Sequence, residues 1–151
     1  MNYIEELRQH TRNMPIIVNG AAGAIIKNEK ILLVLHKRHK QWQIPGGLQE
    51  FGESLEETIV REIKEELNLE LIVERIITVL SDIKWGWEYD NGFKLHPVTV
   101  FYKMKGNIEI EKIKIQKEEI DEYDFFDFDN IPKNMFPCCR EKINILKQEM
   151  K

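Results

Sequence analysis

Residues 54–69 constrain this chain more than any other segment, because they predict a helix whose two ends are both defined. Ser54 and Glu57 have the spacing of a capping box, so the first helical turn is expected to begin at Leu55. Asn68 can adopt the left-handed conformation that ends a helix. Apolar residues recur at helical spacing between these ends and predict one buried stripe: Leu55, Ile59, Val60, Ile63 and Leu67.

Three glutamates crowd one part of this predicted helix. Glu62, Glu65 and Glu66 lie within about one turn, where side chains three and four residues apart meet. Glu62 and Glu66 fall at one edge of the apolar stripe, and a carboxylate at such an edge is unfavourable without a partner. Arg61 is a base close to them in this stretch. Clustered oxygen ligands beside the glycine-rich turn just upstream indicate a Mg²⁺ site for phosphate chemistry, with a solvated acidic face as the alternative.

The stretch from Gly47 to Leu69 resembles the signature of the Nudix hydrolases (MutT-like proteins). That signature reads Gly, five residues, Glu, seven residues, Arg-Glu, an aliphatic, any residue, Glu-Glu, any residue, Gly and an aliphatic. Eight positions match: Gly47, Glu53, Arg61, Glu62, Ile63, Glu65, Glu66 and Leu69. Asn68 stands where the family usually has glycine, and asparagine is the next best residue for a left-handed helix end.

This resemblance implies a fold and a reaction. The fold expected is an α/β class, Nudix-type α/β/α sandwich around a mixed β-sheet, with residues 1–151 as a single domain. The reaction expected is Mg²⁺- or Mn²⁺-dependent pyrophosphohydrolysis, which cleaves the diphosphate linkage of a nucleoside diphosphate joined to another moiety. A catalytically silent nucleotide sensor on the same fold is the alternative. Such a sensor is expected to lose one or more of the metal-binding glutamates, and all three are present here.

The resemblance also assigns the metal ligands. Glu62 and Glu66 are expected to hold one ion, since they lie one turn apart. Glu65 is expected to hold a second ion or to bind through water. The family resemblance adds the carbonyl oxygen of Gly46 as a further ligand. Mg²⁺ prefers octahedral oxygen ligands and retains several waters, which suits so small a set of protein oxygens.

The remaining catalytic assignments concern one arginine and three glutamates. Arg61 is expected to orient a neighbouring glutamate, with a direct phosphate contact as the alternative, and Glu53 is expected to fix the loop or Arg61. The general base is either Glu62 or a glutamate on the loop before the last strand, where Glu119 aligns best by counting back from Phe125. The alternative for Glu119 is an ordinary solvated loop, because acids are abundant between residues 118 and 124.

Two segments are candidates for substrate binding. Residues 36–40 are basic and follow a predicted strand, so Arg38 is a phosphate-contact candidate unless the run is simply solvated. His36 and His39 are poor as a metal pair, because residues three apart in an extended chain point to opposite faces. Trp85, Trp87 and Tyr89 occupy a predicted loop. These rings either stack on a nucleoside base, pack over the sheet or form a homodimer contact.

The sequence does not single out one substrate. Relatives that act on ADP-ribose tend to carry a proline shortly after the signature, and none occurs from residue 70 to 96. Relatives that act on diadenosine polyphosphates tend to have a tyrosine in that region, to which Tyr89 is an approximate match. A nucleoside triphosphate, a nucleotide sugar and a capped RNA end also fit.

Composition excludes several classes of partner. Charged residues make up 32% of the chain and the formal net charge is −4, which argues against non-specific nucleic-acid binding. No stretch is long and apolar enough to predict a membrane span, and the acidic N-terminus does not resemble a secretory signal. Cys138 and Cys139 are adjacent, and sequence neighbours rarely bridge each other, so a reducing cytoplasm is the expected location.

Periodicity and turn residues predict the other elements. Helices are expected over residues 4–12 and from Pro137 to about residue 148. Strands are expected over 16–27, 31–35, 71–83, 95–104 and 123–128. The first two form a hairpin through the turn at Asn28 and Glu29, and the strand over 95–104 is expected to begin or break near Pro97.

Overall fold

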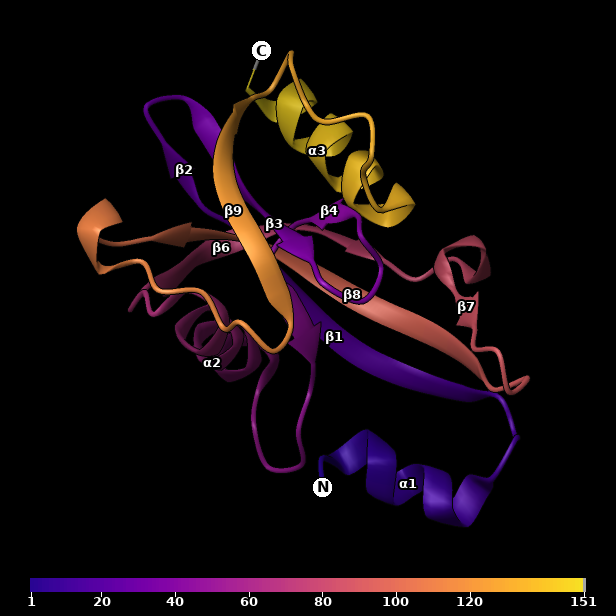
Figure 1. The fold of residues 1–151 in the computed structure, drawn as a ribbon. Coiled ribbons are helices and arrows are strands. Elements are labelled where there is room, and N and C mark those ends of the chain that lie inside the picture. Colours follow the sequence, from indigo (N-terminus) through magenta and orange to yellow (C-terminus); the bar gives the residue numbers. More distant parts are fainter. Residues whose placement is uncertain (151) are drawn as a thin grey trace.

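Three α-helices and nine strands make up residues 1–150, which are the residues described by the computed structural model (Figure 1). The helices are α1 (Tyr3–Thr11), α2 (Leu55–Leu67) and α3 (Pro137–Glu149), with short 3₁₀ helices η1 (Ile83–Trp85) and η2 (Ile110–Lys112). The strands are β1 (Ile16–Ala24), β2 (Ile26–Lys27), β3 (Lys30–His36), β4 (Trp42–Gln43), β5 (Gly46–Leu48), β6 (Ile72–Leu80), β7 (Trp87–Glu88), β8 (Lys94–Lys105) and β9 (Ile120–Asp127).

The strands form two sheets. The larger sheet is mixed, with the order β5-β1-β8-β6 and with β7 paired to β8. Its one parallel pair joins β1 to β8, and the other pairs are antiparallel. The smaller sheet is antiparallel, with the order β2-β3-β4 and with β9 also paired to β3. The predicted hairpin over residues 16–35 is confirmed only for β2 and β3, with Asn28 and Glu29 at positive φ in its turn. Residues 16–24 form β1 instead, which pairs with β5 and β8 in the larger sheet.

Helices α2 and α3 lie on opposite sides of the strands (Figure 1). Strand β3 shows why both are needed, because its side chains alternate between two apolar clusters. Leu32 and Val34 belong to the cluster that contains α2, whereas Ile31 and Leu33 belong to the cluster that contains α3. All four are completely buried, as expected of a strand covered on both faces. The predicted class, an α/β sandwich around mixed strands, is therefore confirmed.

Helix α2 has the ends that the sequence predicts. The Ser54 hydroxyl accepts a hydrogen bond from the Glu57 amide at 3.1 Å, and the Glu57 carboxylate accepts one from the Ser54 amide at 3.1 Å. The helix ends at Asn68, whose φ of 59° and ψ of 31° are left-handed. Helices α1 and α3 also agree with prediction to within a residue or two.

The bounds or continuity of three other predicted strands need correction. The extended segment expected over residues 71–83 ends at Leu80, because the Asp82 side chain accepts a hydrogen bond from Lys84 and begins η1. The last strand runs over Ile120–Asp127 instead of 123–128. Strand β8 continues through Pro97, so the predicted break there is wrong. Among the described residues, β7 pairs with β8 only up to Leu95 and β6 only from Thr99 onward, so the missing Pro97 amide interrupts neither ladder.

Asn68 provides a test of the helix end. Its side-chain amide also donates a hydrogen bond to the Lys112 carbonyl at 3.1 Å. Asn68→Gly removes this bond but tolerates positive φ, whereas Asn68→Ala removes the bond and is strained in the left-handed region. We expect Asn68→Ala to lower the free energy of unfolding by about 1–2 kcal/mol more than Asn68→Gly, measured by urea denaturation. Equal midpoints for the two variants would show that backbone strain at this helix end has no energetic consequence.

Candidate active site

Arg61 is the centre of the hydrogen-bond network on α2. Its Nε and Nη2 atoms donate to the two carboxylate oxygens of Glu53 at 3.0 and 2.8 Å. Nη2 also donates to the Leu48 carbonyl at 3.1 Å. Nη1 donates to Glu62 at 3.0 Å and to Glu65 at 3.3 Å. A guanidinium has five N–H donors, so every donor of Arg61 has an acceptor within this network.

Glu53 is held by more than Arg61. Its Oε1 atom also accepts hydrogen bonds from the Thr58 hydroxyl at 2.8 Å and from the Glu50 amide at 2.9 Å. Hydrogen bonding from Arg61, together with these two donors, holds the pKa of Glu53 at about 2 although burial opposes the shift. Glu53 therefore stays ionised and ties the loop over residues 49–54 to α2. Thr58, which sequence reasoning missed, belongs to this support.

Glu62 and Glu66 form a carboxyl pair in which Glu66 is buried and Glu62 is partly buried. Glu66 is only 5% exposed, and its Oε2 atom has no hydrogen-bond partner among residues 1–150. Burial, followed by the charge of Glu62, raises the pKa of Glu66 well above its usual range, against a hydrogen bond from the Gly46 amide. Burial also raises the pKa of Glu62 to about 7, although Arg61 opposes this shift. The protein alone leaves this pair short of positive charge.

The double glycine of β5 allows this close approach. Gly46 and Gly47 pair with Ala22 and Ala21 of β1. A Cβ atom at Gly47 would overlap the Glu62 carboxylate, and one at Gly46 would overlap the Ala21 carbonyl. Gly46 therefore requires glycine because a Cβ would meet fixed backbone, and a Cβ at Gly47 would displace the Glu62 carboxylate from its position. The glycine-rich segment, predicted as a turn, is instead strand β5, and it brings backbone against the carboxyl pair.

The loop before β9 brings Glu119 toward the same pair. The Gln116 amide donates to the Glu66 carbonyl at 3.0 Å, which fixes this loop to α2. The Lys37 amide donates to the Glu119 carbonyl at 2.7 Å. The charge of Glu119 is near enough to contribute to the raised pKa of both Glu62 and Glu66. Glu65 is more exposed, with 49% of its side chain accessible and bonded to Arg61, and its charge also contributes to the raised pKa of Glu62.

We tested whether these residues suit a divalent cation. Within residues 1–150, no group of three or more acidic, histidine or cysteine side chains is already arranged to hold a metal ion. The site nevertheless supplies several oxygen atoms, from the carboxyl groups of Glu62 and Glu66 and from the adjoining Gly46 backbone. The carboxyl pair has too little positive charge around it, and Oε2 of Glu66 has no partner. Hard cations such as Mg²⁺ favour oxygen ligands, so the donor set fits such an ion.

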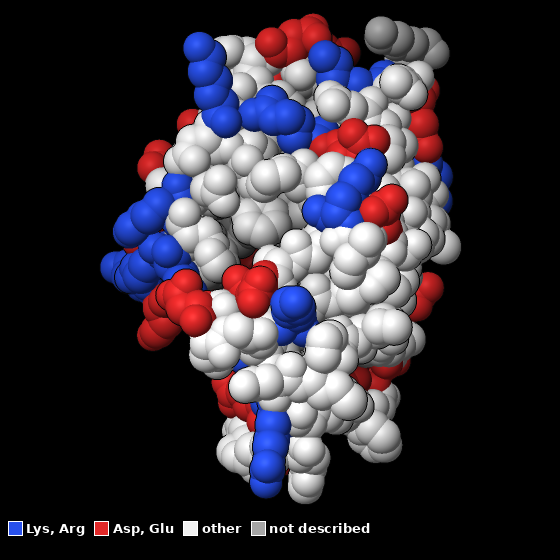
Figure 2. Space-filling view, turned by 90° about the vertical axis from the view of Figure 1, so that its right-hand side faces the viewer, with Lys and Arg blue, Asp and Glu red and all other residues white. Residues whose placement is uncertain are grey.

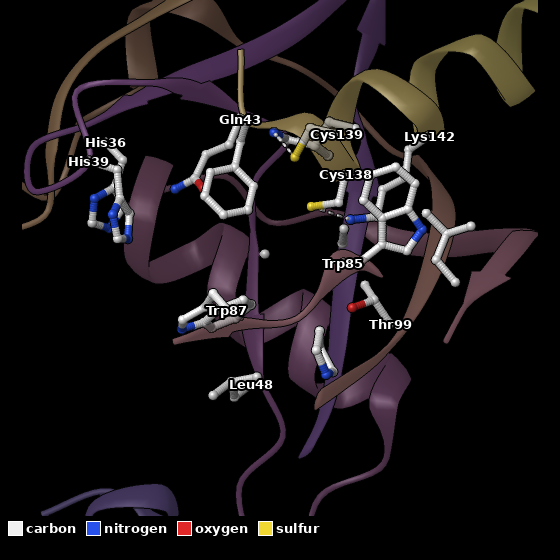
Figure 3. Close-up of a pocket in the computed structure, with 18 of the residues that line it drawn as sticks. His36, His39, Gln43, Leu48, Trp85, Trp87, Thr99, Cys138, Cys139 and Lys142 are labelled. Carbon is white, nitrogen blue, oxygen red and sulfur yellow. Dashed lines mark hydrogen bonds between the residues drawn. The ribbon is translucent and has the colours of Figure 1, made fainter. Parts of the chain in front are cut away.

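A cavity of about 550 Å³ borders β5, since Gly46 and Gly47 form part of its wall. Figure 2 shows the face of the molecule on this side, where basic and acidic side chains surround an uncharged hollow. The four substrate-binding candidates named from the sequence all line the cavity: Arg38, Trp85, Trp87 and Tyr89. Lining residues that sequence reasoning missed include Gln43, Thr99, Phe136, Cys138 and Lys142 (Figure 3).

The aromatic residues both pack against one another and face the cavity. The Trp87 ring makes edge-to-face contacts with Tyr89 at 6.3 Å and with Phe136 at 6.4 Å between centroids. The guanidinium of Arg38 lies 5.8 Å from the centre of the Tyr89 ring. Packing over the sheet and contact with a ligand are therefore compatible for these rings.

The two histidines of the basic segment correct another prediction. The chain turns over residues 37–39, so His36 and His39 do not point to opposite faces, and their ring centroids lie 4.8 Å apart. Burial, and then neighbouring positive charge, lowers the pKa of each imidazole. Both rings line the cavity with Arg38. The prediction for these two histidines assumed an extended chain, and it was wrong because the turn brings the His39 side chain back toward His36.

Two simpler predictions concern the cysteines and membrane spans. Cys138 and Cys139 are free thiols, in agreement with the prediction that these neighbours do not bridge each other. None of the helices in residues 1–150 has the length and apolar character needed to cross a membrane.

The chain belongs to the Nudix family, since a NUDIX domain model matches residues 19–143. It is 32% identical to an ADP-ribose pyrophosphatase of Methanocaldococcus jannaschii, over 76% of this chain and 64% of that protein. It is 25% identical to the NAD-capped RNA hydrolase NudC of Photorhabdus laumondii, over 82% of this chain and 44% of that protein. The chain thus spans less than two thirds of the length of these curated relatives.

Solved structures agree with this fold. A MutT protein from Methanosarcina mazei superimposes with a TM-score of 0.71 at 17% identity, over 89% of this chain and 96% of that one. An ADP-ribose pyrophosphatase from Streptococcus suis gives a TM-score of 0.67 at 21% identity, over 89% and 92%. Identities this low show the Nudix fold alone.

The Glu53–Arg61 pair predicts a specific pH dependence. Because the pKa of Glu53 is lowered from 4.5 to about 2 in the folded protein, the resulting stability is present above pH 4.5 and is lost as the pH falls toward 2. We expect Glu53→Gln to lower the free energy of unfolding by roughly 2–3 kcal/mol at pH 7 and to approach wild type near pH 2. Urea unfolding at several pH values measures this difference.

The exposed Glu111 provides the control. Glu111→Gln is expected to change stability little at any pH. A Glu53→Gln deficit that is the same at pH 7 and pH 2 would mean that the carboxylate charge contributes nothing beyond the shape of the side chain.

Proposed function

We propose that this chain is a Mg²⁺- or Mn²⁺-dependent pyrophosphohydrolase that cleaves the diphosphate linkage of a nucleoside diphosphate joined to another moiety. The observation that carries the proposal is the buried Glu66 carboxyl, with one unpartnered oxygen, beside Glu62 and next to a cavity of about 550 Å³. Membership of the Nudix family supports the same reaction class. We also propose that residues 1–151 form a single Nudix domain.

In this proposal, Glu62, Glu66 and the Gly46 carbonyl hold the cation. Glu65 is the candidate for a second ion, or for contact through water. A bound divalent ion would neutralise phosphate charge and acidify a water molecule. Arg61 acts as a positioning residue, because all five of its donors are already used within the protein and none is left for a phosphate.

Glu119 is the better candidate for the general base. Glu62, the other candidate, already accepts a hydrogen bond from Arg61. Glu119 is exposed on a loop that is bonded to α2 and β3, and its charge acts on the carboxyl pair. A carboxylate in this position can take a proton from the attacking water while the loop keeps it close to the pair.

The cavity supports a nucleotide-type substrate. Trp85, Trp87 and Tyr89 offer ring surfaces for a base, and Arg38 offers a cation for a phosphate. The named relatives make ADP-ribose and an NAD-like cap the first compounds to test. The lack of a proline in residues 70–96 weighs against ADP-ribose, so nucleotide sugars and diadenosine polyphosphates belong in the same screen. A silent sensor is the weaker candidate, because all three glutamates of the signature are present.

A substrate screen tests this function. Purified protein is incubated with ADP-ribose, NAD, nucleotide sugars, diadenosine polyphosphates and nucleoside triphosphates, and released nucleoside monophosphate or phosphate is measured. We expect hydrolysis of at least one compound, its loss with a chelator, and its return with Mg²⁺ or Mn²⁺. Hydrolysis that survives exhaustive chelation would contradict the metal assignment. Tight nucleotide binding without turnover of any compound would favour the sensor.

A further inference from the structure

Lys142 is a buried cation with an unusual partner. Its side chain projects from α3 toward the cavity wall and is only 4% exposed (Figure 3). Its Nζ atom is hydrogen-bonded to Cys138 Sγ at 3.8 Å, and within residues 1–150 no carboxylate lies within salt-bridge distance of it. A buried ammonium group needs a compensating charge. The Cys138 sulfur, to which Lys142 is hydrogen-bonded, supplies one when it is a thiolate.

The surroundings of Cys138 favour its thiolate. Cys138 is the second residue of α3, where the helix dipole stabilises negative charge. A hydrogen bond from Cys139, followed in effect by the charge of Lys142, lowers the pKa of Cys138 to about 6 although burial opposes the shift. These are the conditions under which a cysteine becomes nucleophilic.

The neighbouring Cys139 is a natural internal control. Its Sγ atom is buried and accepts a hydrogen bond from the Ile44 amide at 3.4 Å. The hydrogen bond to Cys138 and burial raise the pKa of Cys139 well above its usual range. The pKa values of the two adjacent thiols are thus shifted in opposite directions, and Cys138 is the partly exposed one.

We propose that Cys138 is a thiol-modification site that exchanges with low-molecular-weight disulfides, and that the attached group occupies the substrate cavity. The Cys138 thiolate attacks one sulfur of the disulfide and forms a new S–S bond. The original S–S bond breaks, and the other half leaves as a thiolate. A small thiol reverses the exchange. Only the effect on substrate rests on the proposed function, whereas the reactivity of Cys138 stands apart from it.

The cavity gives small disulfides access to Cys138, and it is also the space that an attached group would fill. Cys138 and Lys142 line it together with Trp85 and Thr99, and Figure 3 shows these side chains around one space. A group attached to Cys138 therefore lies where the nucleotide moiety is proposed to bind. The Lys142 ammonium favours disulfides that carry negative charge.

The first experiment uses 5,5′-dithiobis(2-nitrobenzoic acid), an anionic aromatic disulfide, on the folded full chain at pH 7. We expect one equivalent of thionitrobenzoate to be released and peptide mapping to locate the adduct at Cys138. Cys139→Ser should still react, whereas Cys138→Ser should not. The reaction should be at least tenfold faster than that of either thiol in the chain unfolded by urea. A slower reaction in the folded chain, or labelling at Cys139, would overturn the proposal.

Variants of the lysine test the cause of the reactivity. Lys142→Met should slow the reaction at least tenfold, and Lys142→Arg, which keeps the cation, should restore most of the rate. Lys147→Met is the matched control, since Lys147 lies on the same helix but pairs with Asp129 at 2.8 Å. Thermal unfolding checks that each variant folds. A Lys142→Met protein that folds and reacts at the wild-type rate would rule out the ion pair.

A nucleotide competition experiment tests the second half of the proposal. Saturating ADP should slow the labelling of Cys138, and the labelled protein should bind ADP at least tenfold more weakly until a small thiol removes the label. Labelling that neither responds to ADP nor weakens its binding would overturn the assignment of the adduct to the substrate cavity. Neither result depends on which compound the protein hydrolyses, so failure here is distinct from failure of the substrate screen.

Discussion

The hydrogen bonds of Arg61 connect the loop that follows β5 to the carboxylates of α2. Through Glu53 and the Leu48 carbonyl, the guanidinium fixes the loop that follows β5. Through Glu62 and Glu65, it compensates part of the negative charge on α2. The Arg61 guanidinium therefore sets the position of β5, which contains the two glycines, relative to the carboxyl pair. Replacement by lysine would retain the charge but lose the planar arrangement of donors.

The network divides its glutamates by environment. Glu53 receives several donors and has a low pKa, whereas Glu62 and Glu66 are buried with too few donors and have raised pKa values. A single arginine cannot satisfy all of these carboxylates, and the deficit is concentrated at the Oε2 atom of Glu66. Local frustration of this kind is typical of functional sites, where folding stability is lowered in favour of ligand binding.

The parts of the molecule that could be predicted from the sequence are those governed by local rules. Helix α2 follows from its capping box, its apolar period and its asparagine end, and the resemblance to the Nudix signature covers the same residues. Counting back from Phe125 also predicted Glu119 as a candidate base, and this residue lies on the loop that is hydrogen-bonded to α2. The relative position of two side chains across a turn was harder to predict, as the contact between the His36 and His39 rings shows.

The cavity could not be assembled from the sequence, because its walls come from distant parts of the chain. Arg38, Trp87 and Lys142 meet only after β8 pairs with β1 and α3 packs across the strands. Adjacent cysteines in a sequence also give no sign that one is partly exposed and the other buried. The hydrogen bond from Lys142 to Cys138 depends on their separation by one helical turn and on the burial of that helix face.

Calorimetric titration of the metal-free protein with Mn²⁺ tests most directly whether the charge deficit at Glu62 and Glu66 is a cation site. The account predicts saturable binding to the wild-type chain and a loss of at least tenfold in affinity for Glu62→Gln and for Glu66→Gln. The exposed Glu70→Gln should bind as wild type does. Glu66→Gln should also unfold at an equal or higher temperature than wild type without metal, because it removes a repulsive charge. Wild-type Mn²⁺ affinity in both site variants would contradict the account.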